Sequence, residues 1–202
     1  MATEQQLATL SEYDFVVAID ASGSMGTEDI KGGRSRWAHM QETAEAFCRD
    51  MNKIDADGLG VVVFSGTNIE SFDGVDVAKI SDIFKSRAPR GGTPLAEALQ
   101  AALKLAGKSD KKDFIIVFTD GVPDDKAAAA KVIRDASNAQ ETDDALTILF
   151  VQVGYDVAAG TYLKMLDDDL KGCKFDIVDA KTIEEAEKFA TTADLVLEAI
   201  ND

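Results

Sequence analysis

The sequence predicts an α/β fold: a Rossmann-like three-layer sandwich with helices on both faces of a central, mostly parallel sheet that has one antiparallel edge strand. Short runs of consecutive apolar residues, typical of strands buried on both faces, recur along the 202 residues. Segments with apolar residues at helical spacing separate these runs. Because no repeat, linker or low-complexity stretch interrupts this alternation, we expect a single domain over residues 1–202 with its core at about 13–200.

The strands are predicted from short apolar runs. Four of these runs (FVVAI, LGVVVF, FIIVF and ALTILFVQV) contain no charged residue and are long enough to cross a buried sheet. Two further segments are shorter and more polar, as expected of edge strands. In chain order, strands are expected at residues 15–19, 59–64, 68–72, 114–118, 145–153 and 175–178.

The helices are predicted where apolar residues recur every three or four positions. Thr93 is expected to cap one of them, with Pro94 as its first helical residue. Thr182 and Glu185 form a capping-box pattern at the start of the last helix. In chain order, helices are expected at residues 37–51, 75–87, 94–106, 124–139, 158–166 and 182–200.

The composition excludes several classes of function. The formal net charge is −16, from 21 basic and 37 acidic residues, which argues against nucleic-acid binding because that needs a basic face. The same charge disfavours binding to anionic membranes, and no apolar run is long enough to span one. No secretory signal is recognisable, and the two cysteines, Cys48 and Cys173, are expected to be buried thiols of a cytoplasmic protein.

The unusual residues follow the predicted strands, in loops where α/β proteins bind their ligands. Asp20 ends a buried strand, and Ser22 and Ser24 follow it at alternating positions. Asp120 ends another buried strand, and Thr93 lies in an independent loop. Two carboxylates and three hydroxyls form an all-oxygen set, which suits a hard cation such as Mg²⁺, Mn²⁺ or Ca²⁺ better than Zn²⁺.

Each motif also has a plainer interpretation when it is taken alone. Thr93 before Pro94 is a common helix cap, the serines fit a turn, and Asp120 before Gly121 is a frequent turn pair. The argument for a cation site therefore depends on all three loops occurring together.

The residues DASGSM at 20–25, Thr93 within GGTPL and Asp120 within FTDG resemble the von Willebrand factor A domain and its metal-ion-dependent adhesion site. The resemblance implies that Ser22 and Ser24 contact the metal directly and that Thr93 does so directly or through water. It also implies that Asp20 and Asp120 act through bound water. Neutral hydroxyls leave the cation under-neutralised, so that an Asp or Glu of a partner protein would complete its coordination.

Arg34 and Arg36 lie in the polar stretch of residues 27–36, which we expect to be a mobile loop beside the metal. Their guanidinium groups could help to bind an acidic partner. The alternative is that both are solvated loop arginines.

The expected function is metal-dependent protein–protein interaction, with Mg²⁺ as the first choice of cation. The family resemblance further suggests a stand-alone bacterial protein in the cytoplasm that works beside an AAA+ ATPase or in a stress-response system. One alternative is an assembly subunit whose metal mainly stabilises the fold. A Mg²⁺-dependent hydrolase is another, but the chain has no phosphate-binding GxxxxGK[ST] loop and no GxSxG elbow. His39, the single histidine, is expected to be partly exposed and without a carboxylate partner, so we do not expect an enzyme.

Overall fold

The centre of the protein is a six-stranded sheet in the computed structural model, which describes residues 3–55 and 57–202. The strand order is β3-β2-β1-β4-β5-β6, and every neighbouring pair is parallel except β2 with β3, which is the antiparallel edge. The predicted fold class is therefore confirmed. The strands are β1 (Tyr13–Asp20), β2 (Leu59–Ser65), β3 (Asn68–Val75), β4 (Lys112–Thr119), β5 (Leu146–Gln152) and β6 (Val178–Thr182).

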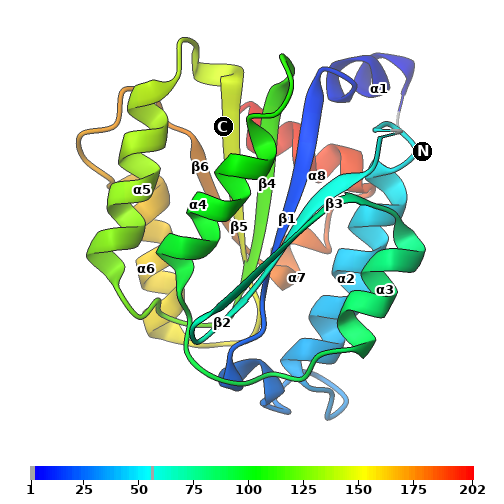
Figure 1. Cartoon of the computed structure of the whole chain (residues 1–202), viewed down its shortest axis with the longest axis vertical. Coiled ribbons are helices and arrows are strands. Elements are labelled where there is room, and N and C mark those ends of the chain that lie inside the picture. Colours follow the sequence, from blue (N-terminus) through cyan, green and yellow to red (C-terminus); the bar gives the residue numbers. More distant parts are fainter. Residues whose placement is uncertain (1–2, 56) are drawn as a thin grey trace.

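Helices cover both faces of this sheet (Figure 1). One face carries α4 (Leu95–Ala106), α5 (Lys126–Ala139) and α6 (Val157–Asp168). The other face carries α1 (Glu4–Leu10), α2 (Arg36–Met51), α3 (Val77–Lys85), α7 (Ile183–Ala186) and α8 (Thr192–Ile200). Two short 3-10 helices, Gly23–Gly26 and Asp143–Ala145, lie in the connections. None of the helices in the described ranges is both long and apolar enough to cross a membrane.

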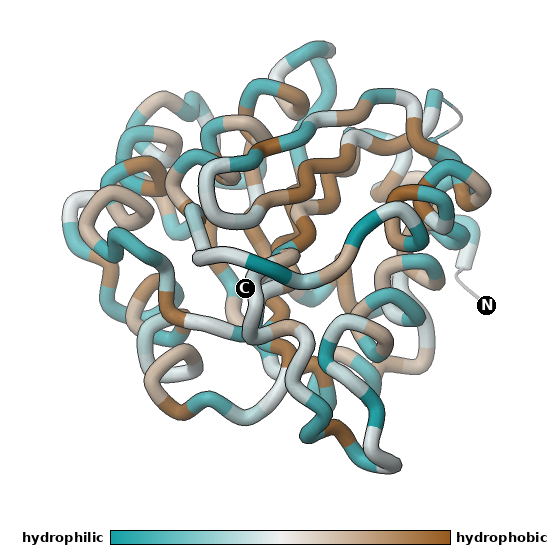
Figure 2. The backbone as a smooth tube through the Cα atoms, turned by 60° about the horizontal axis from the view of Figure 1, so that its bottom comes forward, coloured by the Kyte–Doolittle hydropathy of each residue, from teal (hydrophilic) through white to brown (hydrophobic). Residues whose placement is uncertain are grey.

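The core consists of two apolar layers, one on each face of the sheet. In β1, Phe15, Val17 and Ile19 belong to the layer under α2, whereas Val16 and Ala18 belong to the layer under α4. Successive side chains of a strand point to opposite faces, so a run without polar residues is needed to fill both layers. Figure 2 shows the result as hydrophobic strands surrounded by mixed outer helices.

Several element boundaries differ from the prediction by a few residues, and the largest differences lie in the C-terminal part of the chain. β6 begins at Val178 instead of ending there, because the backbone N–H of Phe175 donates to Ser137 Oγ of α5 and leaves the ladder to start later. The capping box of Thr182 and Glu185 is present, but the helix that it opens ends at Ala186. A new helix, α8, then begins with its own cap at Thr191.

The terminal helix and the cysteines also depart from expectation. Helix α1 was not anticipated, and it begins with a capping box between Thr3 and Gln6. Both cysteines are thiols as expected, but only Cys48 is buried, while Cys173 is partly exposed.

The strand order reverses between β1 and β4. From β1 the chain adds β2 and β3 on one side of the sheet, and β4, β5 and β6 then follow on the other side. At such a reversal, the loops that follow the two strands diverge and leave a crevice where α/β proteins bind ligands. The loops after β1 and β4 meet at the lower edge of the sheet in Figure 1.

The packing of Phe114 offers a test of this core. Its ring centroid lies 6.0 Å from that of Phe15 and 6.5 Å from that of Phe47, so it joins β4, β1 and α2. We expect Phe114→Ala to lower the free energy of unfolding by about 3–5 kcal/mol in urea titrations. Val157→Ala, at a side chain that is 82% exposed, should change it by less than about 0.5 kcal/mol. Equal effects of the two substitutions would contradict the described packing.

Candidate functional site

Backbone hydrogen bonds join two of the three loops that were predicted to form the site, the loop after β1 and the loop before α4. The N–H of Ala21 donates to the carbonyl of Phe64 (2.9 Å), and the N–H of Gly23 donates to that of Gly91 (3.0 Å). The N–H of Arg90 donates to the carbonyl of Ala21 (2.8 Å). The loop after β1 is thus tied to β2 and to the loop before α4 independently of any side chain.

Glycine is needed where these loops touch. Gly91 has φ +75°, and a Cβ there would lie 3.1 Å from the backbone of Gly66. A side chain at this position would push the two loops apart, and residues other than glycine rarely adopt this backbone conformation.

Asp20 ends β1 with its side chain completely buried. One carboxylate oxygen accepts the backbone N–H of Ser22 (2.7 Å), and the other accepts the hydroxyl of Thr119 (2.7 Å). Burial raises the pKa of Asp20 to about 6, although the hydrogen bonds from Thr119 and Ser22 lower it. Both of these hydrogen-bond donors are neutral groups, so neither supplies a positive charge to balance the carboxylate.

Two serine hydroxyls connect this first carboxylate to the second. Ser22 Oγ lies 3.1 Å from Ser24 Oγ, and the hydroxyl of Ser24 donates to Asp120 Oδ1 (2.7 Å). Asp20, Ser22 and Asp120 are buried, whereas Ser24 is exposed. The row of oxygen atoms therefore begins inside the protein and opens to solvent at Ser24.

Thr93 does not cap α4, contrary to our expectation. The helix begins at Leu95 and its cap residue is Pro94, which makes no side-chain capping bond. The carbonyl of Thr93 is engaged instead, because it accepts the N–H groups of Leu95 (2.9 Å) and Asp124 (3.0 Å). Because the helix begins after Pro94, the hydroxyl of Thr93 has no capping role.

Gly121 leaves open space between the loops. A Cβ at Gly121 would lie 3.7 Å from Thr93 Oγ1 and 3.9 Å from Ser24 Oγ. Hydroxyls from two separate loops therefore face the same point beside the end of β4. All five predicted positions (Asp20, Ser22, Ser24, Thr93 and Asp120) are brought to this one edge of the sheet.

Arg36 lies inside the site instead of projecting into solvent. Its Nη1 donates to Asp120 Oδ2 (2.9 Å), and its Nε and Nη2 donate to the carboxylate of Asp29 (3.0 and 2.5 Å). The guanidinium holds the pKa of Asp29 below its ordinary value. The first residue of α2 thereby neutralises Asp120 and fastens the loop of residues 27–35 to the site.

Arg34 is placed differently. It pairs with the exposed Glu42, and its Nη2 lies 2.9 Å from His39 Nδ1. His39 is buried, not partly exposed, and its Nε2 lies 3.2 Å from Glu187 Oε1, so the expectation that it lacks a carboxylate partner was wrong. Neither ring nitrogen has a hydrogen bond to Ser22 or Ser24 within the described part of the chain.

The donor set at this edge fits a hard divalent cation. It consists only of hydroxyl and carboxylate oxygens, and the hydrogen bonds that Asp20 accepts come from neutral groups. The space beside Gly121, which any larger residue would fill, is bordered by two of the hydroxyls. The residues at this edge of the sheet are therefore of the kind that the predicted divalent cation needs as ligands.

Sequence reasoning missed two contributors to the site. Thr119 donates to Asp20, and Asp29 holds the guanidinium of Arg36. Thr119 precedes Asp120 at the end of β4, so the parallel pairing of β1 with β4 could have placed it beside Asp20. Asp29 had no such signal, because it lies in a loop without periodicity.

A second group of carboxylates, Asp167, Asp179 and Asp202, lies around β6. Lys181 Nζ lies 2.8 Å from an oxygen of Asp179 and 2.7 Å from Glu198, so this group already contains a cation. The buried member of the group, Asp179, thus has its counter-charge in the protein, so the group gives no reason to expect a metal.

The fold and the site together define an α/β domain with a hydroxyl-rich acidic site at the switch point of its sheet. The model of the von Willebrand factor type A domain matches residues 15–122, just over half of the chain, and the chain belongs to this family. None of the curated protein sequences matches it.

Several solved structures share the fold. A mutant of the PilB minor pilin from Streptococcus sanguinis has a TM-score of 0.65 at 13% identity, over 94% of this chain and 60% of that one. Manganese-loaded Plasmodium vivax TRAP has a TM-score of 0.60 at 16% identity, over 94% and 74%. The SpRpn10 VWA domain has a TM-score of 0.60 at 12% identity, over 92% and 94%. The chain spans only 20% and 38% of two Mfa5 pilus tip structures from Porphyromonas gingivalis, which match at 23% identity over 55% of this chain with a TM-score of 0.46.

The two arginines give a matched pair for testing the site. Arg36→Gln removes the cation beside the buried Asp120 and should lower the free energy of unfolding by about 3 kcal/mol. Arg34→Gln breaks a pair with an exposed carboxylate and should cost less than about 1 kcal/mol. Urea titrations of the two variants in EDTA measure the difference. A smaller loss for Arg36→Gln than for Arg34→Gln would contradict the described role of Arg36.

Proposed function

We propose that this domain binds an acidic side chain of a partner protein through a divalent cation held at the end of the sheet. Ser22, Ser24 and Thr93 would supply hydroxyl ligands, and Asp20 and Asp120 would hold the charge of the ion and orient the hydroxyl-bearing loops. The observation that carries the proposal is the continuous row of oxygens from Ser22 to Asp120, which opens to solvent at Ser24.

The balance of charge explains why such a site would bind an anion. Hydroxyls carry no charge, and the charge of Asp120 is already shared with Arg36. A divalent ion there would keep part of its charge uncompensated, and hard cations prefer oxygen ligands. A carboxylate from outside is the ligand that satisfies both conditions.

Mg²⁺ is the proposed ion, and Mn²⁺ or Ca²⁺ would meet the same ligands. Manganese-loaded TRAP shares the fold of this domain, which supports a divalent cation here as well. The partner proposed from the family resemblance is a cytoplasmic protein with an exposed Asp or Glu, such as an AAA+ ATPase or a stress-response component.

Hydrolysis is the less favoured alternative. A serine nucleophile would need a base within hydrogen-bond reach, and His39 is engaged with Arg34 and Glu187. An assembly subunit whose metal only stabilises the fold is the other alternative, and metal titration together with affinity capture separates it from partner binding.

Metal binding is expected to raise the melting temperature of EDTA-stripped protein. An ion at about 100 times its dissociation constant stabilises the native state by about 2.7 kcal/mol, or roughly 5–10 °C for a domain of this size. Asp20→Ala should remove the response. Asp167→Asn, in the other acidic group, should retain it. The site is contradicted if Mg²⁺, Mn²⁺ and Ca²⁺ all leave the melting curve unchanged, or if only Asp167→Asn abolishes the response.

Partner binding is tested by affinity capture from cell extract with the native protein and with Ser22→Ala, Ser24→Ala as bait. We expect a protein that is retained with Mg²⁺, released by EDTA and not captured by the double variant. Circular dichroism of the double variant checks that it is folded. A captured protein that is insensitive to both EDTA and the double substitution, together with a large loss of melting temperature in that variant, would favour the structural alternative.

A further inference from the structure

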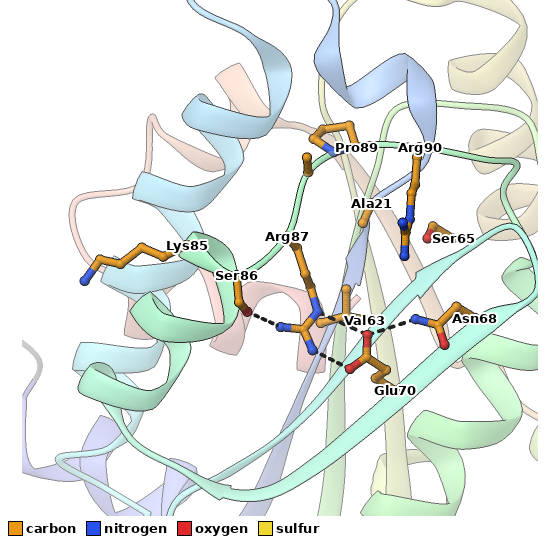
Figure 3. Close-up of a pocket in the computed structure, with 11 residues that line it drawn as sticks. Ala21, Val63, Ser65, Asn68, Glu70, Lys85, Ser86, Arg87, Pro89 and Arg90 are labelled. Atoms are coloured by element: carbon orange, nitrogen blue, oxygen red, sulfur yellow. Dashed lines mark hydrogen bonds and ion pairs between the residues drawn. The ribbon is translucent and has the colours of Figure 1, made fainter.

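A groove of about 460 Å³ lies next to the proposed metal site (Figure 3). Its walls come from β2, β3 and the segment of residues 85–90 that leads from α3 towards the site. Ala21, which lies between Asp20 and Ser22, is also part of its lining. The groove is therefore continuous with the loop that carries the metal-site serines.

One arginine in this groove is already neutralised. Arg87 Nε donates to Glu70 Oε1 (3.2 Å), Nη2 pairs with the other oxygen, and Nη1 donates to the carbonyl of Ile83 (2.9 Å). Asn68 also donates to Glu70 (2.9 Å). Arg87 and Glu70 thus form the floor of the groove and contribute little net charge.

Arg90 is different, because its charge acts on Glu70 from a distance but no carboxylate forms an ion pair or a hydrogen bond with it in the described residues. Its side chain points down into the groove towards Ser65 (Figure 3). Within residues 3–55 and 57–202, neither the guanidinium of Arg90 nor the hydroxyl of Ser65 has a hydrogen bond or an ion pair with another side chain. In a chain of net charge −16, a free guanidinium beside a free hydroxyl is an arrangement suited to a carboxylate.

The position of Arg90 relative to the metal site is fixed by the backbone. Its N–H donates to the carbonyl of Ala21, and Thr93 follows it three positions later in the same loop. A span of three residues is at most about 11 Å even when fully extended. An extended peptide of three or four residues could therefore reach from one position to the other.

We propose that the groove is a second contact for the partner, in which Arg90 and Ser65 bind a second carboxylate of the same acidic segment. The inference rests on the proposed function, because the first carboxylate of that segment would be the ligand of the metal. It specifies the partner sequence as two acidic residues three positions apart in a segment of polyproline II conformation, whose period of three residues places both carboxylates on one side, about 9 Å apart.

The test uses two uncharged Gly/Ser peptides with blocked ends, one with a single Glu and one with two Glu residues three positions apart. Their binding to ¹⁵N-labelled protein is followed by NMR titration in Mg²⁺. We expect the two-Glu peptide to bind about three- to fivefold more tightly, the upper range for one exposed ion pair. Shifts of the Ser65 and Arg90 amides should accompany the two-Glu peptide alone.

Arg90→Gln should abolish this advantage and leave the affinity for the single-Glu peptide unchanged. Arg49→Gln is the matched control, because Arg49 is an exposed arginine in the last turn of α2, the end far from the site. Added salt should reduce the advantage of the two-Glu peptide in the native protein. Equal weakening by Arg90→Gln and Arg49→Gln, or an advantage that survives Arg90→Gln, overturns the inference.

The same titrations separate this inference from the proposed function. Mg²⁺-dependent binding of both peptides with equal affinity would support the metal site and overturn the role of the groove. Arg90-dependent binding that is the same in Mg²⁺ and EDTA would support the groove and overturn the metal as the anchor. No shift with either peptide at millimolar concentration would overturn both.

Discussion

The structure depends on how two carboxylates are accommodated at the ends of adjacent buried strands. Asp20 ends β1 and Asp120 follows β4, in a place where an ionised group loses most of its hydration. The protein compensates them unequally. Asp20 receives two neutral donors, whereas Asp120 receives a serine hydroxyl and the guanidinium of Arg36. The remaining deficit of positive charge lies at Asp20, and the proposed cation would compensate it.

The loops around these carboxylates are held by the backbone rather than by the functional side chains. The bonds of Ala21, Gly23 and Arg90 connect the loop after β1 to its neighbours. Gly91 permits the close approach that these bonds require. This division leaves the hydroxyl of Thr93 without a role in holding its own loop. The hydroxyl of Ser24 donates its proton to Asp120, so its oxygen can still offer a lone pair to a ligand. A site arranged in this way is largely preformed, so that binding has little ordering entropy to overcome.

The fold and the convergence of the site could be predicted because both follow from one rule. Parallel strands buried on both faces end at the same edge, so Asp20 and Asp120 had to meet there. The side-chain partners were not accessible in this way. Arg36 was expected to face a partner or solvent, but the buried Asp120 and the nearby Asp29 hold its guanidinium in the site. Thr93 was expected to cap α4, but the geometry of Pro94 moves the start of that helix to Leu95. Such choices depend on contacts between loops that carry no periodic pattern.

Charge also determines how an acidic protein could attract an acidic partner. The chain carries a net charge of −16, and at physiological salt the repulsion between exposed charges is screened beyond about 8 Å. What the partner meets at the site is therefore the local charge. Arg36 reduces the negative charge of Asp120, the proposed ion would reverse the sign at the end of the sheet, and Arg90 would extend that positive region into the groove. Each of these positive charges acts only within a few ångströms, so a partner must place its carboxylates at these positions. An anionic surface that places no carboxylate there is disfavoured by the general acidity of the chain.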